Sequence, residues 1–431
     1  MTDTVIDTIC DSLARLTPDT TASLTVAFSG GVDSTVLLVA AKSFAAKRNL
    51  SLSACYIHHG LSENATAWQR HCADICERLN IDFEAKSVEV ATTPRESTEA
   101  IARTARYTAL VEHCRQRQSA LLLGQHQDDQ LETVLLQLKR GAGPQGLAAM
   151  PQIQVRNGVV MLRPMLGISR KQIEQSARDL ALPWVEDESN ADTAYDRNFL
   201  RKQIIPLLQS RWPSISETAS RSASLCADQQ ELVKQAAAEK LEQVRKGPGQ
   251  LDGEKLTALP EIWQRAILRQ WFAQHETLPP SRAQLEQILL QLTGKSDAQP
   301  QIEIEDVVLR RFQNDLYWTR KTAVPQAVSE QLIQAGTVTY LEAFALNLSV
   351  SARTDNTQFR VVPVSLNEKV KPQGESVSKP IKQWMKARGI PPWQRQPAAL
   401  LLMDSAPVAC IIPAGLISLQ ALPSDVQLSA S

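Results

Sequence analysis

The sequence predicts an α/β fold: a doubly wound parallel sheet in an N-terminal domain, then a long helix and two smaller α+β or helical domains. Short apolar segments alternate with amphipathic helical patterns about every 30 residues, as in βαβ units. A polar stretch without Gly or Pro follows at residues 217–245, and strand-like alternation returns after residue 300. The length of 431 residues also agrees with about three domains.

The N-terminal elements follow one another in strand–helix order. Each apolar strand segment is short, and each helical segment places apolar residues three or four apart. The expected strands are residues 24–28, 52–57, 83–90 and 120–124. A helix follows each strand: the first ends near residue 48, and the next three cover residues 63–79, 97–117 and 128–139.

The later elements predict the remaining domains. Residues 217–245 form the long helix, which Gly247-Pro248-Gly249 ends. Residues 260–292 are helical, and their tryptophans are more typical of a packed helix face than of a ligand site. Residues 302–318 and 338–350 alternate as strands do, and a strand–helix–strand pattern starts at 358. We therefore expect domains at 1–215, 216–350 and 358–431.

Composition restricts the class of protein. Lys plus Arg and Asp plus Glu both number 46, which excludes a histone-like polycation but not local basic patches. Seven cysteines without a C-x-x-C pair argue against a disulfide framework and favour a reducing compartment. The first residues are acidic, and no apolar run reaches the ~18 residues of a membrane span. We expect a cytoplasmic protein with no membrane partner.

The strongest local motif lies between the first strand and the first helix. It consists of Ser29, Gly30, Gly31, Val32, Asp33 and Ser34. Glycines let backbone N–H groups approach a ligand, and the helix N-terminus favours an anion, so the loop is a candidate phosphate cradle. It lacks the lysine of a Walker A loop. Asp33 inside such a cradle is a candidate Mg²⁺ ligand; the alternative is a Gly-rich turn with a helix cap.

Two other glycine motifs lack the required context. Residues 141–146 match G-x-G-x-x-G, but they follow a helix and contain Pro144, which argues against dinucleotide binding. Residues 294–296 imitate the end of a P-loop, but position 289 is Leu instead of the leading glycine.

The Ser-Gly-Gly-x-Asp-Ser loop resembles that of the PP-loop ATP pyrophosphatases, which have an adenine nucleotide α-hydrolase-like fold. Further motifs resemble the long form of the tRNA(Ile)-lysidine synthetase family nearly end to end. They lie at residues 56–62, 99–107, 124–133, 139–143, 184–190, 195–201, 379–382 and 389–395. Gln125 departs from the pattern, because many relatives carry histidine there.

The resemblance implies a ligase that forms a carbon–nitrogen bond in tRNA(Ile) with the anticodon CAU. ATP would adenylate O2 of the wobble cytidine, and the amine of free L-lysine would displace AMP at C2, leaving lysidine. The base would then pair with A, and aminoacylation would change from Met to Ile. ATP is thus the expected co-substrate and Mg²⁺ the expected cofactor. The sequence names no protein partner and leaves a homodimer open.

The motifs assign candidate roles. The catalytic candidates are Asp33, His126, Asp129 and Glu132, of which Asp33 and Asp129 are also the metal candidates. Asp129 would be a second metal ligand or would orient the amine, and Glu132 would hold the lysine ammonium or take its proton. The candidate ATP-binding residues are those of the loop with His58 and Arg103. The candidate tRNA-binding residues are Arg106, Lys139, Arg140, Arg197, Arg201, Lys379, Lys382 and Lys386.

Ordinary structural roles stay open for several of these. Asp129 and Glu132 are also typical acids of a helix N-terminus. His126 suits a capping or core position, and Arg103 with Arg106 suits a solvated helix face. His58 and His59 are adjacent on a strand end, so their side chains diverge and cannot hold one metal.

Basic residues concentrate near the C-terminus. Between 360 and 395 there are eight Lys or Arg against two acidic residues, and none follows 395. Lys379, Lys382 and Lys386 recur at helical spacing, although Pro380 restricts where a helix starts. We expect residues 358–431 to form a separate domain that binds tRNA phosphates away from the anticodon, on the acceptor arm; a solvated helix face is the alternative.

Three other functions fit the sequence less well. A tRNA-binding protein with a decayed ATP site does not explain the intact loop, Asp129 and Glu132. A tRNA thiolase would need paired or catalytic cysteines, and Cys72 and Cys76 are more typical of a helix core. A GMP or NAD synthetase would need a source of ammonia, which the sequence does not show.

Overall fold

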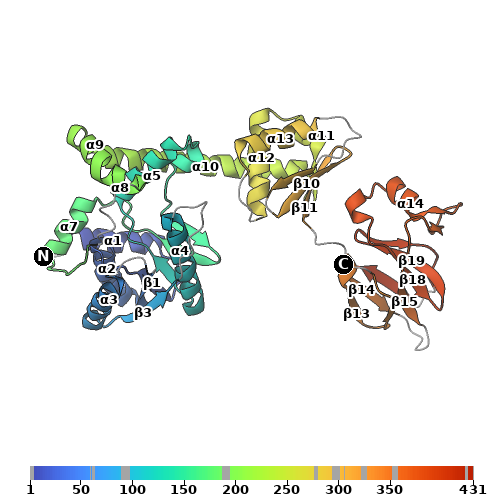
Figure 1. The fold of residues 1–431 in the computed structure, drawn as a ribbon, viewed down its shortest axis with the longest axis horizontal. Helices are drawn as coiled ribbons and strands as arrows, with labels where there is room; N and C mark the ends of the chain where they lie inside the picture. Colours follow the sequence, from blue (N-terminus) through green and yellow to red (C-terminus); the bar gives the residue numbers. More distant parts are fainter. Residues whose placement is uncertain are drawn as a thin grey trace. The chain divides into compact units, whose positions relative to one another are not determined.

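The computed structural model describes most of the chain in two compact units, residues 1–236 and 237–431. The residues described are 4–58, 60, 64–88, 98–186, 195–275, 280–293, 301–304, 306–321, 328–351, 358–422 and 426–430. Figure 1 shows the elements of both units. No described helix combines the length and apolar character that crossing a bilayer requires.

The first unit is built from alternating strands and helices. Its strands are β1 (Ser23–Ala27), β2 (Ser51–His58), β3 (Asp82–Ser87), β4 (Ala120–Leu122), β5 (Ile153–Arg156) and β6 (Val159–Leu162). Its helices are α1 (Thr4–Leu16), α2 (Val32–Arg48), α3 (Ala65–Leu79), α4 (Thr98–Arg117), α5 (Gln127–Lys139), α6 (Pro144–Leu147), α7 (Arg170–Asp179), α8 (Asp196–Phe199) and α9 (Ile205–Arg211), with a π-helical segment at Leu200–Ile204. The expected α/β class and element order are confirmed, with ends that differ by a few residues.

The strands form one sheet in the order β3-β2-β1-β4-β6-β5. The first five are parallel, and β5 pairs antiparallel with β6 at the edge. The chain runs outward from β1 to β3 and then returns to β4 on the other side of β1. This reversal is a topological switch point, where the loops after neighbouring parallel strands leave a crevice.

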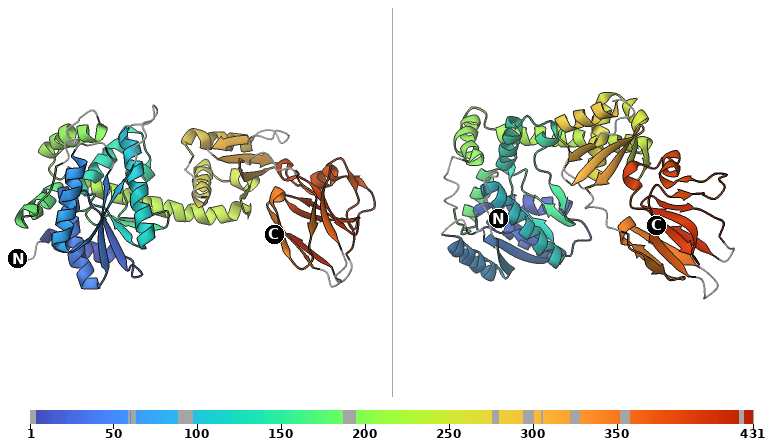
Figure 2. Two further views of the ribbon diagram at one scale, coloured as in Figure 1. Left: turned by 60° about the horizontal axis from the view of Figure 1, so that its bottom comes forward. Right: turned by 45° about the vertical axis from the view of Figure 1, so that its right-hand side comes forward.

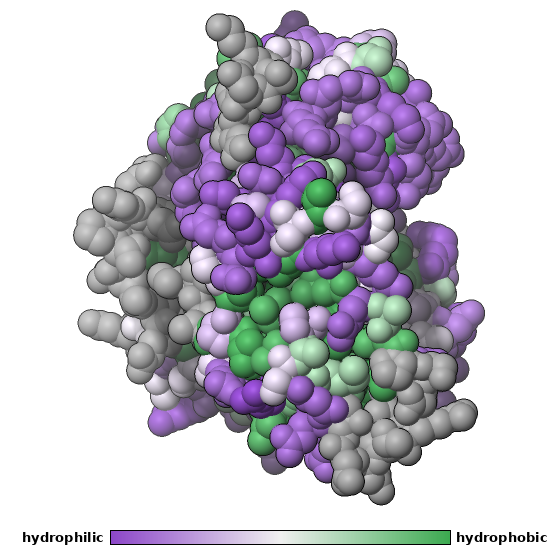
Figure 3. All heavy atoms as spheres, turned by 90° about the vertical axis from the view of Figure 1, so that its right-hand side faces the viewer, coloured by the Kyte–Doolittle hydropathy of each residue, from purple (hydrophilic) through white to green (hydrophobic). Residues whose placement is uncertain are grey.

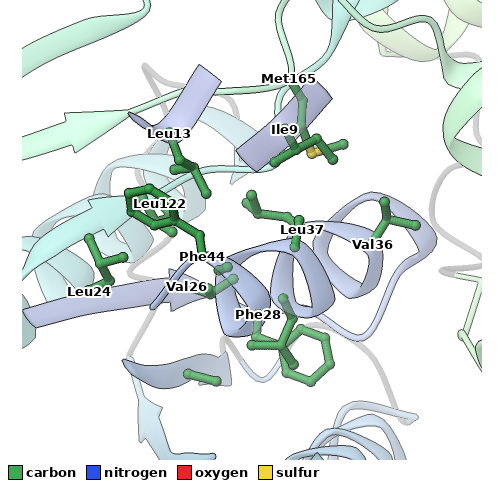
Figure 4. Packing of buried hydrophobic residues seen from close by; sticks show 14 of the residues in the cluster. Ile9, Leu13, Leu24, Val26, Phe28, Val36, Leu37, Phe44, Leu122 and Met165 are labelled. Atoms are coloured by element: carbon green, nitrogen blue, oxygen red, sulfur yellow. The ribbon is translucent and has the colours of Figure 1, made fainter. Parts of the chain in front are cut away.

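Helices cover both faces of this sheet (Figure 2). Apolar residues of α1, α2, α3 and α7 pack against one face, and residues of α4 pack against the other. Figure 4 shows Ile9, Leu37 and Met165 close together in the first of these cores. Such close packing on two faces explains why the inner strands β1, β2 and β4 are largely buried along their length.

A long helix, α10 (Ile215–Val244), and an antiparallel sheet follow. The sheet has the order β7-β8-β11-β10-β9, and its apolar face packs on α11, α12 and α13. The strands are β7 (Arg245–Gly247), β8 (Gln250–Asp252), β9 (Gln301–Ile304), β10 (Val307–Phe312) and β11 (Asp315–Arg320), and the helices are α11 (Gly253–Thr257), α12 (Glu261–Gln274) and α13 (Arg282–Leu292). Trp271 is fully buried in this core, so it is a packing residue, as expected.

The C-terminal part is rich in strands. They are β12 (Gln331–Ile333), β13 (Val338–Leu341), β14 (Leu346–Ser351), β15 (Phe359–Pro363), β16 (Lys369–Val370), β17 (Lys379–Pro380), β18 (Ala399–Met403), β19 (Ala406–Ile412), β20 (Gly415–Ser418) and β21 (Gln427–Ala430), with one helix, α14 (Ile381–Ala387), and single-turn helices at Glu342–Phe344 and Pro392–Gln394. The expected boundary at 350 assigns β12–β14 to the middle domain. Their hydrogen-bonded partners nevertheless include β15 and β21, which lie after residue 358.

The surface of these strands is not uniformly polar. Leu332, Val338 and Tyr340 are each more than half exposed. Figure 3 shows a face of the molecule on which hydrophobic residues gather among hydrophilic ones. Scattered exposed apolar side chains are normal for a folded chain and carry no function by themselves.

Candidate active site at the carboxyl edge of the parallel sheet

The candidate phosphate loop, residues 29–34 and called the phosphate loop below, is held by its own hydroxyl groups. The Ser34 hydroxyl donates to the Gly31 carbonyl over 2.9 Å and accepts from the Ser29 backbone N–H over 3.3 Å. Gly30 has φ +80°, and a Cβ there would lie 2.9 Å from Cys72 Sγ. Glycine is therefore required both for the backbone conformation and for the space.

The end of β4 lies directly against this loop. A Cβ on Gly124 would lie 3.4 Å from the Asp33 carbonyl carbon. Two residues later His126 begins α5 and is buried. Its Nε2 lies 3.7 Å from Asp33 Oδ1 and 3.5 Å from Asp129 Oδ2. The histidine thus stands between the carboxylate of the phosphate loop and that of α5.

Asp129 and Glu132 share the inner face of α5 and one arginine. Arg201 Nε donates to Glu132 Oε1 over 2.7 Å, and Arg201 Nη2 donates to Glu132 Oε2 over 3.1 Å and to Asp129 Oδ1 over 2.9 Å. Arg201 lies in the π-helical segment, a distortion that often re-aims a side chain at a functional site. The sequence motifs assign Arg201 to tRNA, whereas its guanidinium contacts both candidate catalytic carboxylates.

Two residues that sequence analysis did not assign also shape the site. Arg170 donates to Asp33 Oδ2 and pairs with Glu174. Asp128 accepts hydrogen bonds from the Arg170 backbone N–H at 2.9 Å and from the Ser216 hydroxyl at 2.7 Å. Asp128 therefore ties the start of α5 to the starts of α7 and α10. Asp128 lies inside the motif at 124–133, but no local signal marks Arg170 as the partner of Asp33.

Burial sets the acidity of two carboxyl groups. It raises the pKa of Asp33, and the charges of His126 and Arg170 oppose that rise. Burial likewise raises the pKa of Glu132, whose paired Arg201 opposes the rise. Carboxyl groups with raised pKa values in a crevice are typical of functional sites.

Arg201→Met is expected to lower the free energy of unfolding by about 2–3 kcal/mol. Breaking a fully buried pair costs about 3–5 kcal/mol, but Arg201 is 41% exposed, so water compensates part of the loss. Without Arg201, the pKa of Glu132 in the folded state lies further above its value in the unfolded chain. The loss of unfolding free energy relative to the wild type is therefore largest at pH values above that folded pKa, and it shrinks as the pH falls through this pKa.

Urea unfolding at several pH values measures this effect. Lys139→Met is the control, since the Lys139–Asp196 pair is exposed on both sides and is worth at most about 1 kcal/mol. Adding Glu132→Gln to Arg201→Met should restore most of the stability. An Arg201→Met deficit no larger than that of Lys139→Met would contradict the proposed burial of the pair.

The other predicted residues lie at different distances from this centre. His58 ends β2 with its ring edge-on to Tyr56, and Arg103 lies over the Tyr107 ring on α4. Lys139 and Arg140 end α5 and are exposed, and the charge of Arg197 reaches Glu132. His59 lies outside the described residues, as do 187–190 of the motif at 184–190.

The basic C-terminal residues only partly share a helix face. α14 begins at Ile381, so Lys379 lies before it in β17, with its ammonium 4.9 Å from the Trp384 ring centroid. The helical spacing therefore extends only from Lys382 to Lys386. The residue before a proline is disfavoured in helical conformation, which places Lys379 in an extended segment.

The site offers one oxygen suited to a metal. Asp33 Oδ1 is buried and makes no hydrogen bond, whereas both Asp129 oxygens accept one. Within the described ranges, no three His, Cys, Asp or Glu side chains form a group that could hold a metal by themselves. Mg²⁺ is commonly held by one or two carboxylates together with substrate phosphates, which this arrangement fits.

A glycine-rich phosphate loop after β1, facing acidic and histidine side chains after β4 at the switch point, defines a PP-loop nucleotide-binding domain. The family model of the PP-loop domain matches residues 6–208. Models of the TilS substrate binding domain and the TilS substrate C-terminal domain match residues 251–317 and 359–413.

Curated relatives narrow the assignment. A tRNA(Ile)-lysidine synthase of Vibrio parahaemolyticus is 37% identical, over 89% of this chain and 90% of its own. That of Shewanella woodyi is 39% identical over 90% and 88%, and that of Shewanella oneidensis is 46% identical over 69% and 66%. The chain belongs to the tRNA(Ile)-lysidine synthase family.

Proposed function

We propose that the carboxylates at this sheet edge divide the two steps of lysidine formation between them. Asp33 serves the activation by ATP, and Glu132 serves the binding of lysine. The observation that supports this division is their placement: Asp33 lies inside the phosphate loop, while Glu132 is fully buried on α5. His126 and Asp129 lie between them.

The reaction follows from membership of the family. The enzyme is a ligase that uses ATP to form lysidine at the wobble cytidine of tRNA(Ile) with a CAU anticodon. Cytidine O2 attacks the α-phosphorus of ATP and pyrophosphate leaves. The ε-amine of lysine then attacks C2, the C2–O2 bond breaks and AMP leaves. Codon and aminoacylation specificity change from Met to Ile.

In the first step the phosphate loop holds the triphosphate. Its backbone N–H groups, the start of α2 and the Ser29 and Ser34 hydroxyls are donors for phosphate oxygens. We assign Gly30, Gly31 and Val32 to the same contact with the triphosphate. We assign His58 and Arg103 to ATP binding at the rim of this site. His126, within 4 Å of Asp33, is placed to stabilise charge on the transferred phosphoryl group.

Mg²⁺ would be held by Asp33, and by Asp129 once Arg201 releases it. When bound, it would neutralise the charge that develops on pyrophosphate. Arg170 contacts the same Asp33 carboxylate, so it supplies positive charge beside the loop. This guanidinium also favours the ionised form of Asp33 against the effect of burial on its pKa.

In the second step the Glu132 carboxylate would receive the lysine ammonium. Arg201 already places a cation against Glu132 and Asp129, at 2.7 and 2.9 Å. This contact shows that the two carboxylates accept one cationic group together. Glu132, with its pKa raised by burial, is then suited to take the proton that lysine must lose before it attacks.

The tRNA would contact basic residues outside this centre. We assign Arg106, Lys139, Arg140, Arg197 and the outer side of Arg201 to the region near the anticodon. Residues 1–215 would then be the catalytic domain, and the part of 216–350 that precedes β12 would be the connecting helix with a tRNA-binding domain. The C-terminal tRNA-binding domain would include β12–β14 in addition to residues 358–431, because these strands share sheets.

Mass spectrometry tests the proposed reaction. A CAU-anticodon isoleucine tRNA transcript is incubated with the full chain, ATP, Mg²⁺ and isotope-labelled lysine. The expected product carries one lysine at the wobble cytidine, and reactions without ATP should give none. A transcript with a CAU anticodon from methionine tRNA serves as the specificity control. Unmodified isoleucine tRNA in the complete reaction would refute the proposal.

Replacing Lys379, Lys382 and Lys386 together by glutamine should weaken tRNA binding without changing ATP binding. For each phosphate that is no longer neutralised, the slope of log K against log salt should flatten by roughly 0.7–0.9. The three side chains are exposed, so folding should be unaffected. The measurement is tRNA affinity at four salt concentrations, with Lys47, Arg78 and Arg115 replaced together as the control. An unaltered slope would mean that this face is only solvated.

A further inference from the structure

Arg170 contacts the phosphate loop from α7. It is the first residue of that helix, directly after the Ser169 cap. Its Nη1 donates to Asp33 Oδ2, and its Nε donates to Glu174 Oε1 over 2.8 Å. Its backbone N–H donates to Asp128 Oδ2 over 2.9 Å. Backbone and side chain are therefore both fixed, and the guanidinium group is held at the carboxylate of the loop.

This guanidinium group keeps donors for a further ligand. A guanidinium group has five N–H donors in a planar fork, and the contacts with Asp33 and Glu174 use Nη1 and Nε. In the part of the chain that the structure describes, no group accepts a hydrogen bond from Nη2. The side chain is 38% exposed, so an anion in the phosphate loop can reach it.

Arg170 and His126 approach the Asp33 carboxylate at different oxygens. His126 Nε2 lies 3.7 Å from Oδ1, whereas Arg170 contacts Oδ2. His126 stands at the start of α5, the helix that also carries Glu132, the residue that we assign to lysine. The carboxylate of the loop thus has the lysine side of the site at one oxygen and Arg170 at the other.

The chemistry of the first step gives these two sides different roles. In a displacement at phosphorus, the attacking and leaving oxygens lie roughly in line. Cytidine O2 attacks from the side where lysine is later received, because the same base takes part in both steps. Pyrophosphate therefore leaves on the opposite side of the α-phosphorus. Negative charge develops there, and a cation fixed at that position lowers the barrier.

We propose that Arg170 binds the leaving pyrophosphate and is a catalytic residue of the adenylation step. This inference rests on the proposed function. The bond between O2 and the α-phosphorus forms, and the bond from that phosphorus to its bridging oxygen breaks. The electron pair stays on pyrophosphate, and no proton has to move. The Nη groups of Arg170 donate to oxygens of the β- and γ-phosphates, which guanidinium groups suit in charge and geometry, while Glu174 holds Nε.

The affinities of three ligands test this contact. Arg170→Gln should bind inorganic pyrophosphate and ATP about 10- to 100-fold more weakly, the range for one or two charge-assisted hydrogen bonds. AMP should bind as to the wild type, because it lacks the β- and γ-phosphates. The affinities are measured by equilibrium dialysis of the full chain with Mg²⁺. Arg178→Gln is the matched control, since Arg178 also pairs with Glu174, at 3.7 Å, and all three affinities should stay unchanged.

Arg170→Lys separates charge from geometry. Lysine keeps the positive charge but lacks the planar fork, so it should restore part of the affinity for pyrophosphate. Single-turnover adenylation at saturating ATP and tRNA should be about 100-fold slower in Arg170→Gln and less impaired in Arg170→Lys. Urea unfolding checks that both variants fold.

Two results would overturn the role of Arg170. An equal loss of affinity for ATP, pyrophosphate and AMP would show that the residue only supports the shape of the loop. Unchanged affinities in Arg170→Gln would show that its guanidinium group does not reach the phosphates.

The two proposals fail in different ways. If the wild-type chain forms no lysidine on the isoleucine transcript, the proposed function itself is wrong. If the wild type forms lysidine while Arg170→Gln binds pyrophosphate and ATP as tightly as the wild type does, only the role of Arg170 is wrong.

Discussion

Asp33→Ala is expected to reduce pyrophosphate release by about 100- to 1000-fold, the range found when one preorganised charge-stabilising group is removed. The carboxylate lies inside the phosphate loop, and one of its oxygens is buried without a hydrogen bond. Arg170 is partly exposed and keeps Glu174 as a partner, so we expect the variant to fold, and urea unfolding checks this. Loss of activity in this variant would therefore reflect chemistry and not unfolding.

The experiment separates the ATP site from the tRNA site. Pyrophosphate release is measured with saturating tRNA, and tRNA affinity is measured separately, where little change is expected. Ser34→Ala should act in the same direction, because its hydroxyl closes the loop against Ser29 and Gly31. Asp179→Ala, at the exposed end of α7, is the control. Near-normal adenylation by Asp33→Ala would show that the loop has been wrongly assigned.

Glu132→Gln is expected to slow lysine transfer about 100-fold, the scale of general acid–base catalysis, with adenylation close to normal. The substitution keeps the shape of a fully buried side chain and removes its charge. Arg201 keeps Asp129 as an ionic partner at 2.9 Å. The amine of lysine, however, loses both its counter-charge and its proton acceptor.

Single-turnover kinetics measure the transfer step by itself. Adenylated tRNA is formed first at saturating ATP, and labelled lysine is then added. Glu112→Gln, an exposed carboxylate on α4 paired with Arg115, is the control. Normal transfer combined with weaker ATP binding would place Glu132 at the metal instead.

Much of the fold could be predicted because its signals are local. The inner strands β1, β2 and β4 of the first sheet are largely buried, and the helices between the strands carry a regular apolar pattern, so β1 to α5 appear in the expected order. The phosphate loop is equally local: two glycines, two serines and an aspartate act within six consecutive positions. The reaction was predicted from the resemblance to a known family, because no residue pattern alone specifies it.

Partners distant in the sequence could not be predicted in this way. Arg170 and Asp33 are 137 positions apart, and Arg201 and Glu132 are 69 apart. Periodicity reports which face of an element is buried, but it does not report which charged side chain folds back onto it. The same limit explains why β12–β14 were expected in the middle domain although they pair with strands after residue 358.

The sequence by itself determined the parallel α/β architecture and marked the loop 29–34 with His126, Asp129 and Glu132 as candidate site residues, because short-range pattern and motif encode them. The tertiary structure alone decided that guanidinium groups contact the carboxylates of Asp33, Asp129 and Glu132, and that the buried Arg163 donates to the uncharged side chain of Gln125. The physical reason is that ion pairing and burial depend on which strand ends the chain brings together. In this fold the return from β3 to β4 places those ends side by side at one edge of the sheet.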